Sequence, residues 1–159
     1  MEEKNGEHPY GDLGQLIFLG IFLIVWVADS FFLHVSTFLA AFIPLALRLV
    51  VLVCALGAAF YLGNSGHVVV SHGERPTEVV STGAFRYVRH PLYLACILFY
   101  LGLAVSTASL LSLALWIIAC IFYNFMANYE EKLLDLKYGE EYRQYRQKTG
   151  KWLPGLGRA

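Results

Sequence analysis

Long apolar runs separated by shorter polar segments dominate the hydropathy pattern of this chain. Four runs stand out, at residues 13–33, 38–62, 92–105 and 110–127. A helix needs about 20 apolar residues to cross a bilayer, so the third run is short and the other three are close to this length or above it. The pattern predicts an all-α, polytopic membrane protein with about four transmembrane helices, and the chain length favours a single membrane-embedded domain over 1–159.

Two longer polar segments, residues 63–91 and 128–159, hold most of the lysines and arginines. By the positive-inside rule both segments face the cytoplasm, and with four crossings the N-terminus does so too. We therefore predict an integral membrane protein with cytoplasmic N- and C-termini, a cytosolic loop over 63–91 and a cytosolic tail over 128–159. The tail contains a C-terminal cytosolic helix, with Gly139 as a C-cap. A hairpin of the third and fourth runs brings the residues before the third and after the fourth to one cytoplasmic face.

Composition agrees with the membrane class and narrows the function. Hydrophobic residues make up 57% of the chain and charged residues only 15%, whereas soluble domains carry about 25% charged residues. The net charge of zero lacks the basic excess of nucleic-acid-binding proteins, so we predict no nucleic-acid partner. The cysteines lie inside apolar runs, and His67 and His72 have no third ligand, so we predict no metal site.

The segment directly before the third run carries the first candidate chemistry. Pro91 is well suited to the first position of a helix and disfavours helical backbone at His90, which it holds extended at the helix N-terminus. Helix N-termini favour anions, and Arg89 adds a permanent positive charge. The pair suits a carboxylate or a phosphate, while Tyr93, on the first turn, offers a hydroxyl or a ring face.

A second polar cluster lies where the fourth run ends. Glu130 and Glu131 suit an ammonium or hydroxyl groups, and the predicted hairpin places them near His90 and Tyr93. A ligand with a carboxylate, an ammonium and an aromatic base would fit both ends of this site, and S-adenosylmethionine is such a ligand. Further along the tail, the residues at positions 142, 145 and 146 share one helical face.

GAFRYVRHPLY, an apolar hairpin and then YEEKLLDLKYGEEYRQYRQKTGKWLP follow one another over residues 81–154. This order and spacing resembles the integral-membrane methyltransferases of the isoprenylcysteine carboxyl methyltransferase and phospholipid methyltransferase superfamily. The resemblance implies a helical membrane core whose cytosolic cofactor pocket is closed by the loop and the tail. It implies that S-adenosylmethionine binds through the positions matching His90, Pro91, Tyr93, Glu130 and Glu131, and that Arg89 acts near the reacting groups.

Two positions depart from the family's pattern. The carboxyl methyltransferases have an arginine shortly before the Glu-Glu pair, but residues 124–129 of this chain contain none. Many members also have a glycine soon after the tyrosine of the RHPxY element. Here Tyr93 is followed by Leu94, and we take Gly102 as the residue that lets the cofactor approach closely.

These observations predict an S-adenosylmethionine-dependent methyltransferase of the membrane. Its acceptor would be a lipophilic small molecule, an isoprenylcysteine-like carboxylate or a lipid headgroup that enters from the bilayer, with membrane lipids as further partners. We place Arg89, Tyr142 and Arg146 at the reacting groups, and we assign Trp152 to the membrane interface. Two alternatives stay open: an NADPH-dependent membrane reductase of the sterol-reductase type, and a non-enzymatic membrane protein whose polar clusters bind lipid headgroups.

Two charged residues, Asp29 and Arg48, lie inside the first and second apolar runs. An arginine this far into an apolar run is often functional, although its side chain can also extend to the interface. Arg48 could serve an anionic group of the acceptor, or it could pair with Asp29 if the two helices bring them together.

Overall fold

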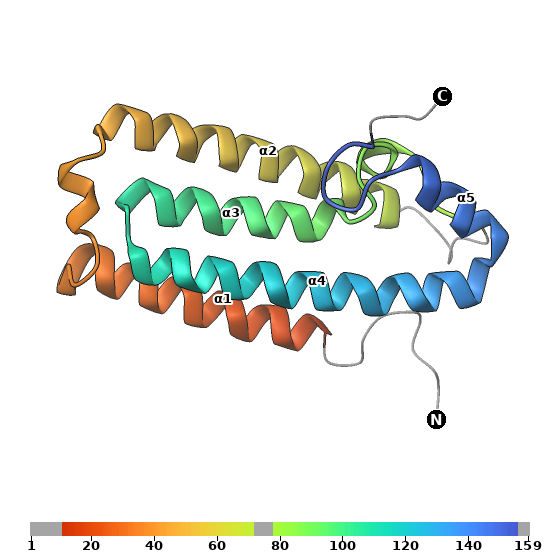
Figure 1. Ribbon diagram of the computed structural model, residues 1–159, viewed down its shortest axis with the longest axis horizontal. Coiled ribbons are helices and arrows are strands. Elements are labelled where there is room, and N and C mark those ends of the chain that lie inside the picture. The colour runs from red at the N-terminus through yellow and green to blue at the C-terminus, as the bar shows by residue number, and fades with distance from the viewer. Residues whose placement is uncertain (1–10, 72–77, 156–159) are drawn as a thin grey trace.

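A computed structural model describes residues 11–71 and 78–155, without the side chains of residues 67–71. Within this part of the chain there are five α-helices and no strand. They are α1 (Gly11–Val27), α2 (Leu45–Ser71), α3 (Pro91–Thr107), α4 (Leu110–Tyr138) and α5 (Glu140–Lys148). The first four form a bundle in which α3 packs against both α2 and α4, and α1 packs against α4 (Figure 1). The predicted all-α membrane fold is confirmed.

In the part of the chain that the structure describes, three helical segments are long and apolar enough to cross a membrane: Asp12–Leu33, Leu45–Gly66 and Leu110–Tyr138. The first consists of α1 and a π-helix over Ala28–Leu33 that continues it. The fourth apolar helix, α3, has 17 residues and is shorter, as the sequence predicts. Helix α4 has 29 residues and is longer than a single span requires, and Gly139, with φ of 54°, separates it from α5, which has 9 residues.

The predicted boundaries of the second run and of the loop after it are wrong. The run was expected to be helical from residue 38, but residues Phe38–Ala41 form a separate 3-10 helix and α2 begins only at Leu45. Pro44 explains the break, because a proline disfavours helical backbone at the residue before it and is well tolerated at a helix start. At its other end α2 continues to Ser71, so the loop before α3 is shorter than 63–91.

Aromatic and small residues fill the centre of the bundle. Phe22, Tyr100 and Tyr123 are almost completely buried, and Ala104 and Ala119 let the helices approach them. The small residue Gly102 plays the same part on the opposite side of α3. A Cβ atom at Gly102 would lie 3.0 Å from the Cβ of Ala55 on α2. Gly102 thus faces α2 nine residues beyond Tyr93, where it permits close helix packing, and its role in cofactor approach stays a prediction.

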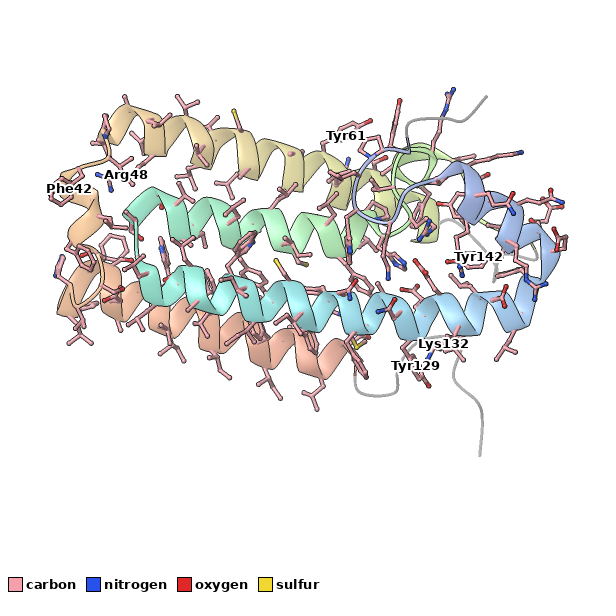
Figure 2. The ribbon with its side chains drawn as sticks, in the orientation of Figure 1. Phe42, Arg48, Tyr61, Tyr129, Lys132 and Tyr142 are labelled. Carbon is pink, nitrogen blue, oxygen red and sulfur yellow. The ribbon has the colours of Figure 1, made fainter. Side chains whose placement is uncertain are left out.

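Asp29 and Arg48 both lie at the end of the bundle that contains the short α3–α4 turn, but they are not paired. The Asp29 carboxylate is buried and accepts hydrogen bonds from Ser36 Oγ at 2.5 Å and Ser109 Oγ at 2.6 Å. Arg48 instead donates to the backbone carbonyls of Ile43 at 3.2 Å and Ser106 at 2.9 Å (Figure 2). The suggested pairing is therefore wrong, because serines and carbonyl groups satisfy the two charged groups separately.

Candidate functional site

The opposite end of the bundle gathers the start of α3, the end of α4, α5 and the segment that follows α5 (Figure 1). Pro91 is the first residue of α3, as predicted, and His90 is its N-cap. The backbone of His90 has φ of −125° and ψ of 64°, which is non-helical but less extended than the sequence suggested. This conformation turns the His90 side chain into the bundle end, where the residue is only 5% exposed.

The buried carboxylate of Glu131 is the centre of the cluster. Its Oε1 atom lies 3.0 Å from Arg89 Nη2, 3.1 Å from His90 Nε2 and 3.8 Å from Lys151 Nζ. Glu130 Oε2 lies farther from the ring, 3.4 Å from His90 Nδ1, and its side chain is 31% exposed. The structure thus brings together four residues predicted for the site, and it shows that Glu131 has three basic neighbours while Glu130 has one.

His90 is held between the two glutamates, and this decides its protonation. Burial alone lowers the pKa of His90, but hydrogen bonds and charges from Glu130 and Glu131 outweigh burial and raise it above the ordinary 6.5. A protonated imidazole can donate from both ring nitrogens, one to each carboxylate. The cluster thus favours a positively charged His90 at a pH where a free histidine would be largely neutral.

The segment after α5 crosses the cluster and is tied to it by Arg89. The Arg89 Nη1 atom donates to the carbonyl oxygens of Arg146 at 3.2 Å and Thr149 at 2.5 Å. The backbone N–H of Arg89 donates to the Gly150 carbonyl at 2.9 Å. In addition, the Tyr145 hydroxyl donates to the Phe85 carbonyl at 2.6 Å. These contacts hold the tail against the segment before α3.

This segment contributes two site residues that the sequence analysis did not place there. Lys151 contacts Glu131 and donates to Asn128 Oδ1 at 2.6 Å. The Trp152 ring lies 5.9 Å from the His90 ring, so Trp152 covers the cluster and does not stand apart at a membrane interface. The sequence shows Lys151 and Trp152 directly after the tail helix, but it does not show that they belong to the site. Only the structure shows this, because the chain after α5 returns to the start of α3.

An aromatic row connects the polar cluster to the apolar core. The rings of His90 and Tyr93 are nearly parallel, with centroids 5.6 Å apart and an angle of 6°. The Tyr93 ring lies 5.5 Å from that of Tyr123, which is buried between α3 and α4. Tyr123 and Tyr100 in turn are part of the wall of an apolar cavity.

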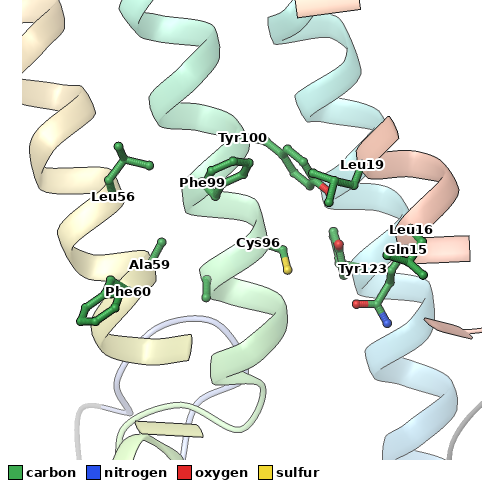
Figure 3. Close-up of a pocket in the computed structure, with 11 residues that line it drawn as sticks. Gln15, Leu16, Leu19, Leu56, Ala59, Phe60, Cys96, Phe99, Tyr100 and Tyr123 are labelled. Carbon is green, nitrogen blue, oxygen red and sulfur yellow. The ribbon is translucent and has the colours of Figure 1, made fainter. Parts of the chain in front are cut away.

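This cavity has a volume of about 650 Å³ and is walled by α1, α2, α3 and α4 (Figure 3). Its lining is apolar apart from a few groups and consists of Gln15, Leu16, Leu19, Leu56, Ala59, Phe60, Ala95, Cys96, Phe99, Tyr100 and Tyr123. Leu16 is 66% exposed and Phe60 76% exposed, so the cavity opens on the outer face of the bundle. An apolar chain could therefore reach the inner end of the aromatic row from the lipid side.

Tyr142 on α5 is almost completely buried, and its hydroxyl has no hydrogen-bond partner among the described residues. Burial, followed by the negative charge of Glu131, raises its pKa, so the hydroxyl is protonated and able to donate. Figure 2 shows Tyr142 pointing from α5 toward the interior of the same bundle end. Buried hydroxyls without a partner are rare, and such a group calls for an explanation.

Other predicted site residues have less direct places in the cluster. Arg146 contributes its carbonyl to Arg89, and its exposed side chain lies beside a second cavity described below. Pro91 is buried at the start of α3. Gly102 lies away from the cluster, and His72 and the His67 side chain lie outside the described residues. The roles assigned to the site residues stay predictions.

Comparison with known proteins agrees with this arrangement. The sequence model of the family described as "Phospholipid methyltransferase" matches residues 40–141. Over 89 residues the chain is 32% identical to a "Probable protein-S-isoprenylcysteine O-methyltransferase" of Oryza sativa subsp. indica. The matched region covers 55% of this chain and 47% of that protein. Over 94 residues it is 34% identical to a "Protein-S-isoprenylcysteine O-methyltransferase" of Schizosaccharomyces pombe, covering 55% of this chain and 38% of that protein.

The chain thus spans half the length of these curated relatives or less. The family match nevertheless covers well over half of this chain, and it contains Arg89, His90, Glu130 and Glu131, whereas Lys151 lies beyond it. This chain belongs to the phospholipid methyltransferase family.

Proposed function

We propose that the protein is an S-adenosylmethionine-dependent methyltransferase that acts in the membrane on a lipophilic acceptor. The observation that carries the proposal is the buried cluster in which Arg89 and His90 face Glu130 and Glu131 at the start of an apolar helix. Charged groups are costly to bury, so such a cluster at the end of a membrane bundle is expected to bind something. Family membership favours a methyl donor as that ligand.

The groups present suit the chemistry of S-adenosylmethionine. The ammonium or the ribose hydroxyls of the cofactor would bind Glu130, because this carboxylate is partly exposed and, among the described residues, has a single ion-pair contact, at 3.4 Å from His90. The carboxylate of the cofactor would lie near Arg89 and the N-terminus of α3. The unpartnered Tyr142 hydroxyl supplies one more donor on the α5 side. We assign Glu131 a different part, since Arg89, His90 and Lys151 already surround it.

When bound, the cofactor supplies a methyl group attached to a positively charged sulfur. The protein has to hold the acceptor atom in line with the methyl carbon and exclude water. Glu130, Arg89 and the N-terminus of α3 would hold the cofactor, whose methyl carbon would be supplied to a lone pair of the acceptor while the carbon–sulfur bonding electrons would stay on sulfur. A carboxylate acceptor has no proton to lose, so this site needs no general base for it. The Trp152 ring over His90 and the tail held by Arg89 provide cover from water.

We propose that the acceptor enters from the bilayer through the 650 Å³ apolar cavity. The exposed rim at Leu16 and Phe60 faces the lipid side of the bundle, and the inner end at Tyr123 meets Tyr93, which stacks on His90. An acceptor with a long apolar chain would fill the cavity and place its polar end beside the cluster. An isoprenylcysteine carboxylate and a phospholipid headgroup both have this form.

The orientation in the membrane follows from the basic residues. Arg86, Lys132, Lys137 and the arginines of α5 lie at the end that holds the cluster, whereas Arg48 lies at the other end. The positive-inside rule therefore supports a cytosolic site with cytoplasmic N- and C-termini. A soluble cofactor would reach the cluster from the cytosol.

Calorimetric titration of the detergent-purified protein with S-adenosylmethionine and, separately, with NADPH tests the proposal. We expect saturable S-adenosylmethionine binding that Glu130→Gln weakens by roughly tenfold, as for a hydrogen bond to a charged group. Glu140→Gln is the matched control, because Glu140 is exposed on α5 and makes only a 3.9 Å contact with Arg143. NADPH binding would instead indicate a reductase, and binding of neither cofactor would favour a headgroup-binding protein.

A further inference from the structure

A second cavity, of about 550 Å³, lies beside the C-terminal half of α4, at the same bundle end as the cluster. Its lining differs from that of the apolar cavity because charged and aromatic side chains share it. The lining residues are Arg89, Phe125, Asn128, Tyr129, Glu131, Lys132, Asp135 and Arg146. Arg89 and Glu131 belong to the cluster already described. The remaining lining residues form a separate wall along α4, where Figure 2 labels Tyr129 and Lys132, except for Arg146, which lines the cavity from α5.

The charges around this cavity are not balanced. Each acidic residue that lines it already has a basic partner: Glu131 pairs with Arg89, and Asp135 pairs with Arg143 at 2.9 Å. Within the described residues, the side chains of Lys132 and Arg146 form no ion pair. The cavity therefore has two basic groups left for an outside partner, and this partner should be an anion.

The position of these bases along α4 indicates what kind of anion. Phe125 is 61% exposed and lies seven residues before Lys132, which is about 10 Å along a helix axis. Phe125 follows the apolar part of α4, and the aromatic Tyr129 lies between it and Lys132. The wall thus changes from apolar to aromatic to basic in the direction of the cytosolic end, which matches a molecule with an apolar chain and a negatively charged head.

We propose that this cavity binds the phosphate of an anionic membrane lipid, with Lys132 and Arg146 on the phosphate and with Phe125 and Tyr129 against the start of its apolar chains. The proposal goes beyond the methyltransferase function and does not depend on it. Because Arg89 and Glu131 line both this cavity and the cofactor cluster, the lipid would lie next to the groups that hold the tail. The bound lipid is distinct from the acceptor, which we place in the apolar cavity.

Titration of the detergent-purified protein with phosphatidylglycerol, followed by native mass spectrometry, tests this lipid site, with phosphatidylcholine as the zwitterionic comparison. We expect Lys132→Gln to weaken phosphatidylglycerol binding by roughly fivefold, the effect of one basic residue near an anionic lipid. Lys132→Arg should retain binding. Lys137→Gln is the matched control, because it removes the same charge from the same helix at a residue that does not line the cavity. Thermal unfolding of each variant establishes that it is folded.

Two results would overturn the proposal. Equal weakening by Lys132→Gln and Lys137→Gln would mean that the tail attracts anionic lipid through its general positive charge. Displacement of phosphatidylglycerol by millimolar inorganic phosphate would mean that the cavity takes a soluble anion. Failure of the lipid site and failure of the methyltransferase proposal are distinguishable, because S-adenosylmethionine binding is measured separately on the same preparation.

Discussion

The substitution Tyr142→Phe separates a structural role of this residue from a role in ligand binding. In the structure the Tyr142 hydroxyl is buried and has no hydrogen-bond partner within residues 11–71 and 78–155. The change to phenylalanine removes only this oxygen and keeps the ring that packs 6.1 Å from Tyr145. If the hydroxyl serves a ligand, its removal should help the ligand-free protein and harm the complex.

The two expected effects have opposite signs and similar sizes. Burying a hydroxyl without a partner costs about 1–3 kcal/mol, so Tyr142→Phe should raise the free energy of unfolding by about 1 kcal/mol. For a chain of this size that corresponds to a melting temperature roughly 2–4 °C higher. Loss of one hydrogen bond to the cofactor should weaken its binding by about 1 kcal/mol, or roughly fivefold.

Tyr145→Phe is the matched control, because the Tyr145 hydroxyl donates to the Phe85 carbonyl at 2.6 Å. Its removal should lower the melting temperature, while cofactor affinity changes little in the folded protein. Thermal unfolding in detergent and calorimetric titration with S-adenosylmethionine measure both quantities. Destabilisation by Tyr142→Phe similar to that by Tyr145→Phe would refute the idea of an unsatisfied hydroxyl. Unchanged cofactor affinity in Tyr142→Phe would refute the ligand contact.

Three further predictions concern other parts of the molecule. Since the glutamates raise the pKa of His90, the stability that they confer is fully present below pH 6.5 and is lost as the pH rises through the raised pKa; the melting temperature of the wild-type protein should fall over this range, and that of His90→Gln should stay flatter. Gly102→Ala should lower the free energy of unfolding by about 1 kcal/mol without loss of S-adenosylmethionine affinity, because the added Cβ would lie 3.0 Å from the Cβ of Ala55 on α2. A loss of affinity with an unchanged free energy of unfolding would instead place Gly102 at the cofactor site. Asp29→Asn should lower the free energy of unfolding by about 1–3 kcal/mol, since Oδ2 accepts both serine hydroxyls and Oδ1 accepts the Ser36 backbone N–H, so the amide NH2 of asparagine would face a donor at either position, and an unchanged melting temperature would contradict this.

The helical membrane fold could be predicted from the sequence because three of the four apolar runs are close to or above the length of a membrane span and the fourth is continuous. The start of α3 at Pro91 and a helix end at Gly139 were also predicted, since proline and glycine act through their own backbone geometry, although the helix that ends at Gly139 is α4 itself and not a separate tail helix. The start of α2 was misplaced because the apolar run continues through Pro44. Hydropathy alone does not register a backbone break when the residues on both sides of it are equally apolar.

The candidate site could be predicted only where neighbouring residues in sequence share a function. The sequence analysis found two pairs of neighbouring residues, Arg89 with His90 and Glu130 with Glu131. The predicted hairpin of the third and fourth apolar runs then placed the two pairs close together. Lys151 was missed because its position depends on the return of the tail to the start of α3. This return is fixed by hydrogen bonds from Arg89 to backbone carbonyl acceptors in the tail. These acceptors are carbonyl groups, which every residue has, so no side-chain pattern marks them.

We propose that the two adjacent glutamates have different tasks. Glu131 is buried among Arg89, His90 and Lys151, and each of these comes from the segment before α3 or from the tail. Loss of its charge would leave three basic groups without their shared partner, so Glu131 has to be in place before the site exists. Glu130 lies on the exposed side of the same turn and makes a single long contact with His90, so it can exchange that contact for a ligand without releasing the tail. A Glu-Glu pair at the end of an apolar helix can thus provide assembly through one carboxylate and binding through the other. Adjacent residues on a helix point about 100° apart, so one can face the protein while its neighbour faces the ligand.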